Sequence, residues 1–133
     1  MAENNNEQKL QEKYMEFQML QQQMEQVSKY LEELDGKVHE FMQTRTNLKK
    51  MAEMPLSEAF VSLAPGIFAQ AEMKENQKFI VNVGANVLVE KSVPQISEML
   101  DRQIKEISQV QIQMDQNLQS LNTRINELVK ELS

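Results

Sequence analysis

Apolar residues recur every three or four positions along two long stretches of this chain, one near each end. In the first stretch, eleven of the thirteen repeat positions are apolar: Leu10, Lys13, Phe17, Leu20, Met24, Val27, Leu31, Leu34, Val38, Phe41, Arg45, Leu48 and Ala52. In the second, nine of ten are apolar: Leu100, Ile104, Ile107, Gln111, Met114, Leu118, Leu121, Ile125, Leu128 and Leu132. A left-handed coiled coil needs a seam of this period. The sequence therefore predicts two long helices that pair as an antiparallel hairpin.

The first helix should occupy residues 8–54, after a frayed N-terminus over residues 1–7 whose asparagine run carries no apolar repeat. The seam keeps its phase across Gly36, so we expect no break there in spite of the low helix propensity of glycine. Pro55 ends the helix, because the residue before a proline is disfavoured in helical geometry.

Between the helices, residues 55–92 are rich in β-branched and aromatic residues. Pro65 and Gly66 fit a type II turn, and a second short turn begins at Gly84. We expect two β-hairpins in series, with strands over residues 58–63, 67–73, 78–83 and 87–91. These strands carry apolar residues on both faces, and an isolated two-stranded hairpin is marginal in water. The chain should therefore assemble into an oligomer through this centre.

The second helix should occupy residues 93–133, with Ser92 and Gln95 in the spacing of a capping box. The predicted fold class is thus α+β, a long antiparallel coiled-coil hairpin with two central β-hairpins. At 133 residues we expect a single structural unit.

Composition excludes several classes of protein. The chain has no cysteine, a net charge of −6 and a single histidine, His39, so we expect no thiol chemistry, no metal site and no cofactor. The acidic balance argues against a nucleic-acid partner, since Lys49 and Lys50 are the densest basic spot. No membrane span or signal peptide is expected, which makes the cytoplasm the default location. No nucleotide loop or catalytic set is present, so an enzyme is not expected.

Apolar residues also gather near the outer end of both predicted helices: Leu10, Tyr14, Met15, Phe17, Met19, Leu20, Ile125, Leu128, Val129 and Leu132. We call this set the apolar tip, because an antiparallel hairpin brings the two groups to the same end. Some members fall outside the seam, and methionine suits surfaces that bind varied partners. Two interpretations remain open, an exposed surface that binds other proteins or a slightly wide core stripe.

Polar residues interrupt the seams at Lys13, Arg45 and Gln111. A polar residue at a core position can fix the pairing register at a cost in stability. For Lys13, fraying near the helix end is an equal alternative.

The β-rich centre resembles the alpha class of prefoldin subunits. The resemblance is most specific in the segments Ala64-Pro65-Gly66-Ile67-Phe68-Ala69-Gln70-Ala71-Glu72-Met73 and Val81-Asn82-Val83-Gly84-Ala85-Asn86-Val87-Leu88-Val89-Glu90-Lys91-Ser92. Two hairpins favour the alpha over the beta class, and the helices match in pattern only. The simple acidic chain favours an archaeal source.

The resemblance implies a hexamer of two alpha with four beta-class prefoldin subunits, whose hairpins form a β-barrel platform. It implies an ATP-independent holdase that captures non-native client proteins at the apolar tip and transfers them to a group II chaperonin. Platform contacts would come from Phe60, Val61, Phe68, Phe79, Val81, Val87 and Val89. The alternatives are a structural adaptor coiled coil that binds one defined partner and, less compatible with the charge, a nucleic-acid arm.

Overall fold

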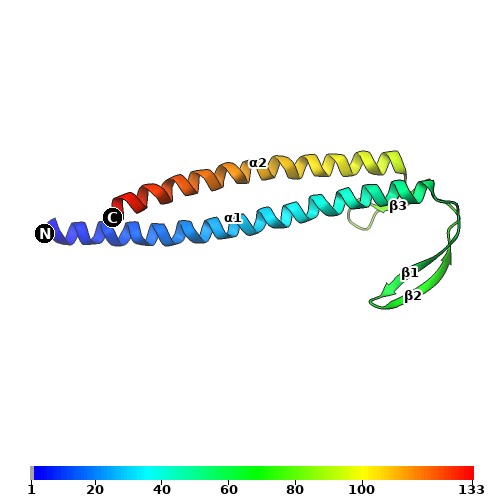
Figure 1. Cartoon of the computed structure of the whole chain (residues 1–133), viewed down its shortest axis with the longest axis horizontal. Coiled ribbons are helices and arrows are strands. Elements are labelled where there is room, and N and C mark those ends of the chain that lie inside the picture. Colours follow the sequence, from blue (N-terminus) through cyan, green and yellow to red (C-terminus); the bar gives the residue numbers. More distant parts are fainter. Residues whose placement is uncertain (1) are drawn as a thin grey trace. The chain divides into compact units, whose positions relative to one another are not determined.

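The computed structural model describes residues 2–133, with side chains from residue 3 onward. Figure 1 shows two long helices and two hairpins in the predicted order. The elements are α1 (Ala2–Glu53), β1 (Glu58–Ala64), β2 (Ile67–Glu72), β3 (Lys78–Asn82), β4 (Leu88–Ser92) and α2 (Val93–Leu132). Each strand lies within one residue of its predicted bounds, and the α+β class is confirmed.

Helix α1 begins earlier than the apolar repeat predicted, at Ala2 in place of residue 8. Residues 2–7 extend a helix that the seam already holds, so each adds backbone hydrogen bonds without needing an apolar contact. Glu3 in the first turn also complements the helix dipole. Met1 lies outside the described residues. The helix continues through Gly36, as the unbroken phase of the seam predicted.

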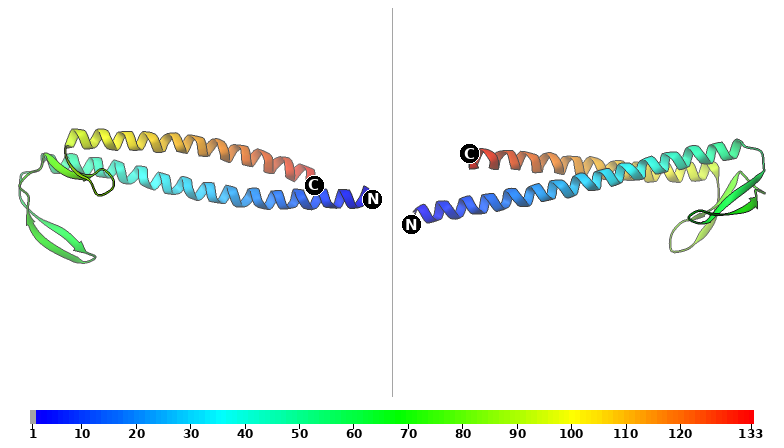
Figure 2. Two further views of the ribbon diagram at one scale, coloured as in Figure 1. Left: turned by 180° about the vertical axis from the view of Figure 1, so that it is seen from behind. Right: turned by 60° about the horizontal axis from the view of Figure 1, so that its bottom comes forward.

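Two compact units divide the chain. The helical unit comprises the residues up to Val38 together with Lys105–Ser133, and the mixed unit comprises His39–Ile104. Each long helix contributes to both units. In the helical unit the two helix segments lie side by side and antiparallel, which the views of Figures 1 and 2 show consistently.

Burial in both helices follows the predicted seams. From Lys13 onward every seam position of α1 is buried or half-buried, and so is every seam position of α2. In the helical unit the core is formed by Leu34, Ile125 and Leu128, the last of which has no exposed surface. In the mixed unit Val93, Ile96 and Leu100 are buried on one face of α2. The helices therefore pair through one apolar stripe each.

The three polar seam residues each contact the opposite helix. Lys13 Nζ lies 3.2 Å from Glu131 Oε2, and Gln111 Nε2 donates to Asp35 Oδ1 at 2.6 Å. Arg45 forms an ion pair with Asp101. Such directional contacts are made in only one alignment of the helices, which favours the register interpretation over fraying.

The hairpins are two separate two-stranded antiparallel sheets. The β1–β2 ladder runs from Glu58 opposite Glu72 to Ala64 opposite Ile67 with an irregularity near Ser62, and the β3–β4 ladder runs from Lys78 opposite Ser92 to Asn82 opposite Leu88. A two-stranded sheet cannot bury the side chains on either of its own faces. Both sheets therefore leave apolar side chains without cover.

The two hairpin turns depend on left-handed backbone. Gly66 has a φ of 77°, as the type II turn requires. In the second turn Ala85 and Asn86 have φ values of 50° and 60°, and Val87 N donates to Gly84 O at 2.9 Å. This is the geometry of a type I′ turn, whose twist matches that of the flanking strands. The left-handed geometry therefore extends beyond the glycine on which the sequence prediction relied.

Helix ends in the mixed unit are capped by side chains. Ser92 N donates to Gln95 Oε1 at 2.9 Å, and Gln95 N donates to Ser92 Oγ at 3.3 Å, which confirms the capping box of α2. At the end of α1, Gln77 Nε2 donates to Ala52 O at 2.8 Å and Asn76 Nδ2 to Met54 O at 2.7 Å. These amides satisfy carbonyls that the helix end leaves unpaired.

Replacement of Leu128 by alanine should destabilise the helical hairpin by about 2–5 kcal/mol, because it opens a cavity in the seam. The measurement is thermal unfolding followed by circular dichroism at 222 nm on the assembled protein. Val129→Ala is the matched control, since Val129 is adjacent but 48% exposed. Equal destabilisation by the two changes would contradict the assigned seam.

Candidate functional site

The structure brings together the two halves of the apolar tip. In the helical unit, residues 10–20 of α1 lie against the last turns of α2, and the ion pair between Lys13 and Glu131 joins them. The start of α1 and the end of α2 lie at this end of the helical unit (Figure 1). Residues separated by more than a hundred positions in the sequence thus form one surface.

The members of the apolar tip differ in exposure. Leu128 has no exposed surface and Ile125 is 9% exposed, so these two residues mainly hold the helices together. Phe17, Leu20 and Leu132 are half-buried at the seam. Five members are exposed: Leu10, Tyr14, Met15, Met19 and Val129. Met15 has the largest exposed fraction of these, 69%. The alternative of a wide core stripe therefore does not account for these five residues.

A hollow of about 540 Å³ opens between the helix ends at the tip. Its walls are formed by Leu10, Gln11, Tyr14, Met15 and Leu132. The ring of Tyr14 lies 6.5 Å from that of Phe17, centroid to centroid, with the planes tilted by 38°. Apart from Gln11, the walls are apolar or aromatic. The hollow can accept an apolar side chain, and such burial would be favourable by roughly 25 cal/mol per Å².

An ion pair that the sequence analysis missed ties the helices together behind the tip. Arg124 Nε donates to Glu16 Oε1 at 2.9 Å, and Arg124 Nη2 donates to Glu16 Oε2 at 3.2 Å. A third donor, Nη1, reaches Glu127 one turn further along α2. The bidentate hydrogen bond to Arg124 lowers the pKa of Glu16, and the same bonds raise the pKa of Arg124. The sequence signal was weak, because both residues lie beside the seam and 108 positions apart.

The predicted platform residues lie on the two hairpins, and most are uncovered. Phe60 is 73% exposed and Phe68 64%, while Val61, Val87 and Val89 are also exposed. Phe79 and Val81 are half-buried on β3. The sequence analysis omitted further exposed apolar residues on the same sheets, which alternation along each strand could have revealed: Leu63, Ile67, Ile80 and Leu88. Both sheets therefore present apolar faces that could contact other chains.

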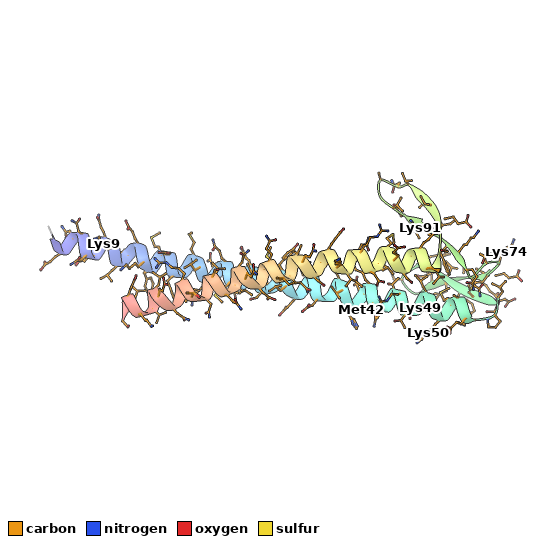
Figure 3. All side chains as sticks on the ribbon, turned by 90° about the horizontal axis from the view of Figure 1, so that it is seen from above. Lys9, Met42, Lys49, Lys50, Lys74 and Lys91 are labelled. Atoms are coloured by element: carbon orange, nitrogen blue, oxygen red, sulfur yellow. The ribbon has the colours of Figure 1, made fainter. Side chains whose placement is uncertain are left out.

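Other sites find little support in the part of the chain that the structure describes. No group of three or more His, Cys, Asp or Glu side chains there could hold a metal ion. Among the described helices, none has a stretch long and apolar enough to cross a bilayer. Lys49 and Lys50 project outward from α1 in Figure 3 and are exposed, as expected for a solvated helix end.

Comparison with known proteins identifies prefoldin subunits as relatives of this chain. Residues 6–133 match the family model for prefoldin subunits. The chain is 30% identical over 128 residues to prefoldin subunit alpha of Archaeoglobus fulgidus, covering 96% of this chain and 93% of that protein. It is also 30% identical over 133 aligned residues to prefoldin subunit alpha of Pyrococcus horikoshii, covering 98% of this chain and 88% of that one.

A solved structure shares the fold. The cryo-EM structure of filamentous PFD from Methanocaldococcus jannaschii superposes with a TM-score of 0.80 and 18% sequence identity. The match covers 89% of this chain and 98% of that chain. At this identity the likeness concerns the fold, namely two long helices and two small antiparallel strand pairs.

The ion pair between Glu16 and Arg124 predicts a sensitivity to acid. Because the pKa of Glu16 is lowered from its ordinary 4.5, its stabilising contribution is complete above that value and is lost as the pH falls through the lower, folded-state pKa. Thermal unfolding between pH 6 and pH 3 should therefore show a smaller loss of Tm for Glu16→Gln than for the wild type. The effect should be small because both side chains are partly solvated.

Glu12→Gln, one turn earlier on an exposed face of α1, is the control and should follow the wild-type profile. An identical acid profile for Glu16→Gln and the wild type would contradict a stabilising role of the ion pair.

Proposed function

The chain belongs to the prefoldin family, and on that basis we propose that it is the alpha-class subunit of an ATP-independent holdase. Prefoldin is a chaperone family and not an enzyme family, so the chain has a chaperone-type function. Alpha subunits of this family form oligomeric complexes with other prefoldin subunits. The finer proposal concerns where clients bind, how they are held and to which protein they pass.

We propose that client proteins bind at the apolar tip. The observation that supports this is the exposure of Leu10, Tyr14, Met15, Met19 and Val129 near the helix ends, where the first three line one hollow. Unfolded proteins expose apolar side chains that folded proteins bury, and these would remove the tip residues from water. Methionine is unbranched and polarizable, so it adapts to side chains of different shape. The surface therefore suits varied clients better than one defined partner.

Weak binding at several tips would hold a client without ATP. A contact at one tip raises the effective concentration of the client at the others, so individually weak contacts add up. Each contact stays reversible, and transfer to a group II chaperonin needs only a competing surface of higher affinity. In this proposal the nucleotide-driven step belongs to the chaperonin.

We further propose that the hairpins supply the assembly surface and that the whole chain acts as one prefoldin-type unit. Exposed apolar faces on both two-stranded sheets support this, since short hairpins need cover and edge partners. Two alpha and four beta subunits would join their hairpins into a β-barrel platform. Barrel closure would pair the free strand edges and bury the apolar faces.

Polar substitution of the exposed tip should weaken client holding. The variant Tyr14→Gln/Met15→Gln/Met19→Gln/Val129→Gln removes apolar surface and keeps good helix formers on exposed positions. Loss of burial at four side chains should reduce the affinity for clients by roughly tenfold or more. The measurement is light scattering from a guanidinium-unfolded enzyme diluted without ATP into the complex of this chain with a beta-class partner.

The matched control is Met42→Gln/Met54→Gln, which removes two methionines that are 43% and 55% exposed in the mixed unit. It should suppress aggregation as the wild type does. If the tip variant also suppresses aggregation fully, clients bind elsewhere. If the wild-type complex itself fails to suppress aggregation, the result favours the adaptor alternative over the holdase proposal.

Polar substitution of the β1–β2 hairpin should weaken assembly instead. Phe60→Ser/Phe68→Ser removes both aromatic side chains of that sheet, which are 73% and 64% exposed. The hexamer with a beta-class partner should dissociate at concentrations at least tenfold higher than for the wild type, because two aromatic contacts are lost. Size-exclusion chromatography with light scattering measures this. Lys74→Ser, in the polar loop between the hairpins, is the control, and equal dissociation of both variants would contradict the proposed platform.

A further inference from the structure

We propose that a groove beside the seam in the helical unit binds the main chain of an extended client segment through side-chain amides. This inference rests on the proposed holdase function and adds the chemical group that is recognised. The groove has a volume of about 900 Å³. It is lined by Gln18, Gln21, Gln22, Met24, Glu25, Ser28, Asn122 and Ile125.

The groove combines an apolar floor with polar walls. Met24 is half-buried and Ile125 is 9% exposed, so these two seam residues form the floor. Gln18, Gln21 and Gln22 are exposed on the α1 side, and Asn122 is exposed on the α2 side. An extended peptide can place apolar side chains on such a floor while its N–H and C=O groups face the walls.

Each wall amide can both donate and accept hydrogen bonds. The cross-helix hydrogen bonds in this part of the molecule are made by Arg124 and Gln111, and the wall amides take no part in them. The amides are therefore free to pair with a bound segment. A peptide group presents the same donor and acceptor pair whatever its side chain, so the recognition would be independent of client sequence.

The spacing of the amides matches an extended chain. Gln18 and Gln22 are four residues apart on α1, which corresponds to about 6 Å along the helix axis. Gln21 and Glu25 have the same separation. An extended strand presents main-chain groups on one side every two residues, about 6.6 Å apart. From Gln18 to Ser28 the wall is about 15 Å long, enough for roughly four or five extended residues.

The chemistry of the walls selects an unfolded polypeptide over other ligands. The lining has no Lys or Arg and includes Glu25, which disfavours the phosphates of a nucleic acid or a lipid. A folded protein has already paired its main-chain groups in helices and sheets, whereas an unfolded segment has not.

The test compares two fluorescent peptides with identical apolar side chains. One of them is N-methylated at alternate residues, so that one edge of its extended main chain cannot donate hydrogen bonds. Binding to the complex with a beta-class partner is measured by fluorescence anisotropy. We expect the wild type to bind the unmethylated peptide about three- to tenfold more tightly, as one or two hydrogen bonds would give. Gln18→Ala/Gln22→Ala should reduce that ratio at least twofold.

Gln43→Ala/Gln113→Ala removes two exposed amides that do not line the groove and should keep the wild-type ratio. A benzophenone side chain in place of Ser28 should cross-link the unmethylated peptide to this chain in preference to the methylated one. If the wild type binds both peptides equally, or Gln18→Ala/Gln22→Ala keeps the full ratio, the inference is overturned and the holdase proposal stands. If neither peptide binds, the holdase proposal fails, and the inference fails with it.

Discussion

The apolar seam between α1 and α2 is the interaction on which the rest of the structure depends. Each helix buries one stripe, centred on Leu34 in α1 and on Ile125 and Leu128 in α2 of the helical unit. Two helices offer no other interior, so any apolar residue outside the stripe stays at the surface. Burial of the stripe is thus what holds the helices in place, and it also leaves the remaining apolar residues available for other contacts.

Those remaining apolar residues are concentrated at two places. Met15 and Tyr14 lie at the helix ends, and Phe60 and Ile80 lie on the hairpins. The chemistry of the two places differs. The tip carries two exposed methionines, Met15 and Met19, and a small hollow, which suits weak contacts with many shapes. The hairpins have free strand edges as well as apolar faces, and this suits a stable and directional assembly. One chain can therefore combine a permanent contact with a transient one.

Polar contacts across the seam fix which residues of the two helices lie opposite each other, which a uniform apolar stripe does not do. Apolar packing alone tolerates a shift of one helix along the other by a full repeat. The pairs of Gln111 with Asp35 and of Arg124 with Glu16 form in only one alignment. A fixed alignment places Leu132 beside Leu10 and Tyr14 at the hollow, and Asn122 across the groove from the glutamines of α1. The surfaces proposed for clients therefore depend on polar contacts that contribute little to stability themselves.

The sequence by itself determined the elements of this protein, because their causes are local. A 3.5-residue repeat, Pro55, and the pair of Ser92 with Gln95 are enough to place both long helices except for residues 2–7 of α1, and turn residues place the strands. The seam also separated Leu128 from its neighbour Val129, which are fully buried and 48% exposed. Only the tertiary structure decided how far the burial extends, since Leu10 is a seam position and is nevertheless 48% exposed. It also decided the contact between Glu16 and Arg124 across 108 positions, because that contact depends on how the two helices meet.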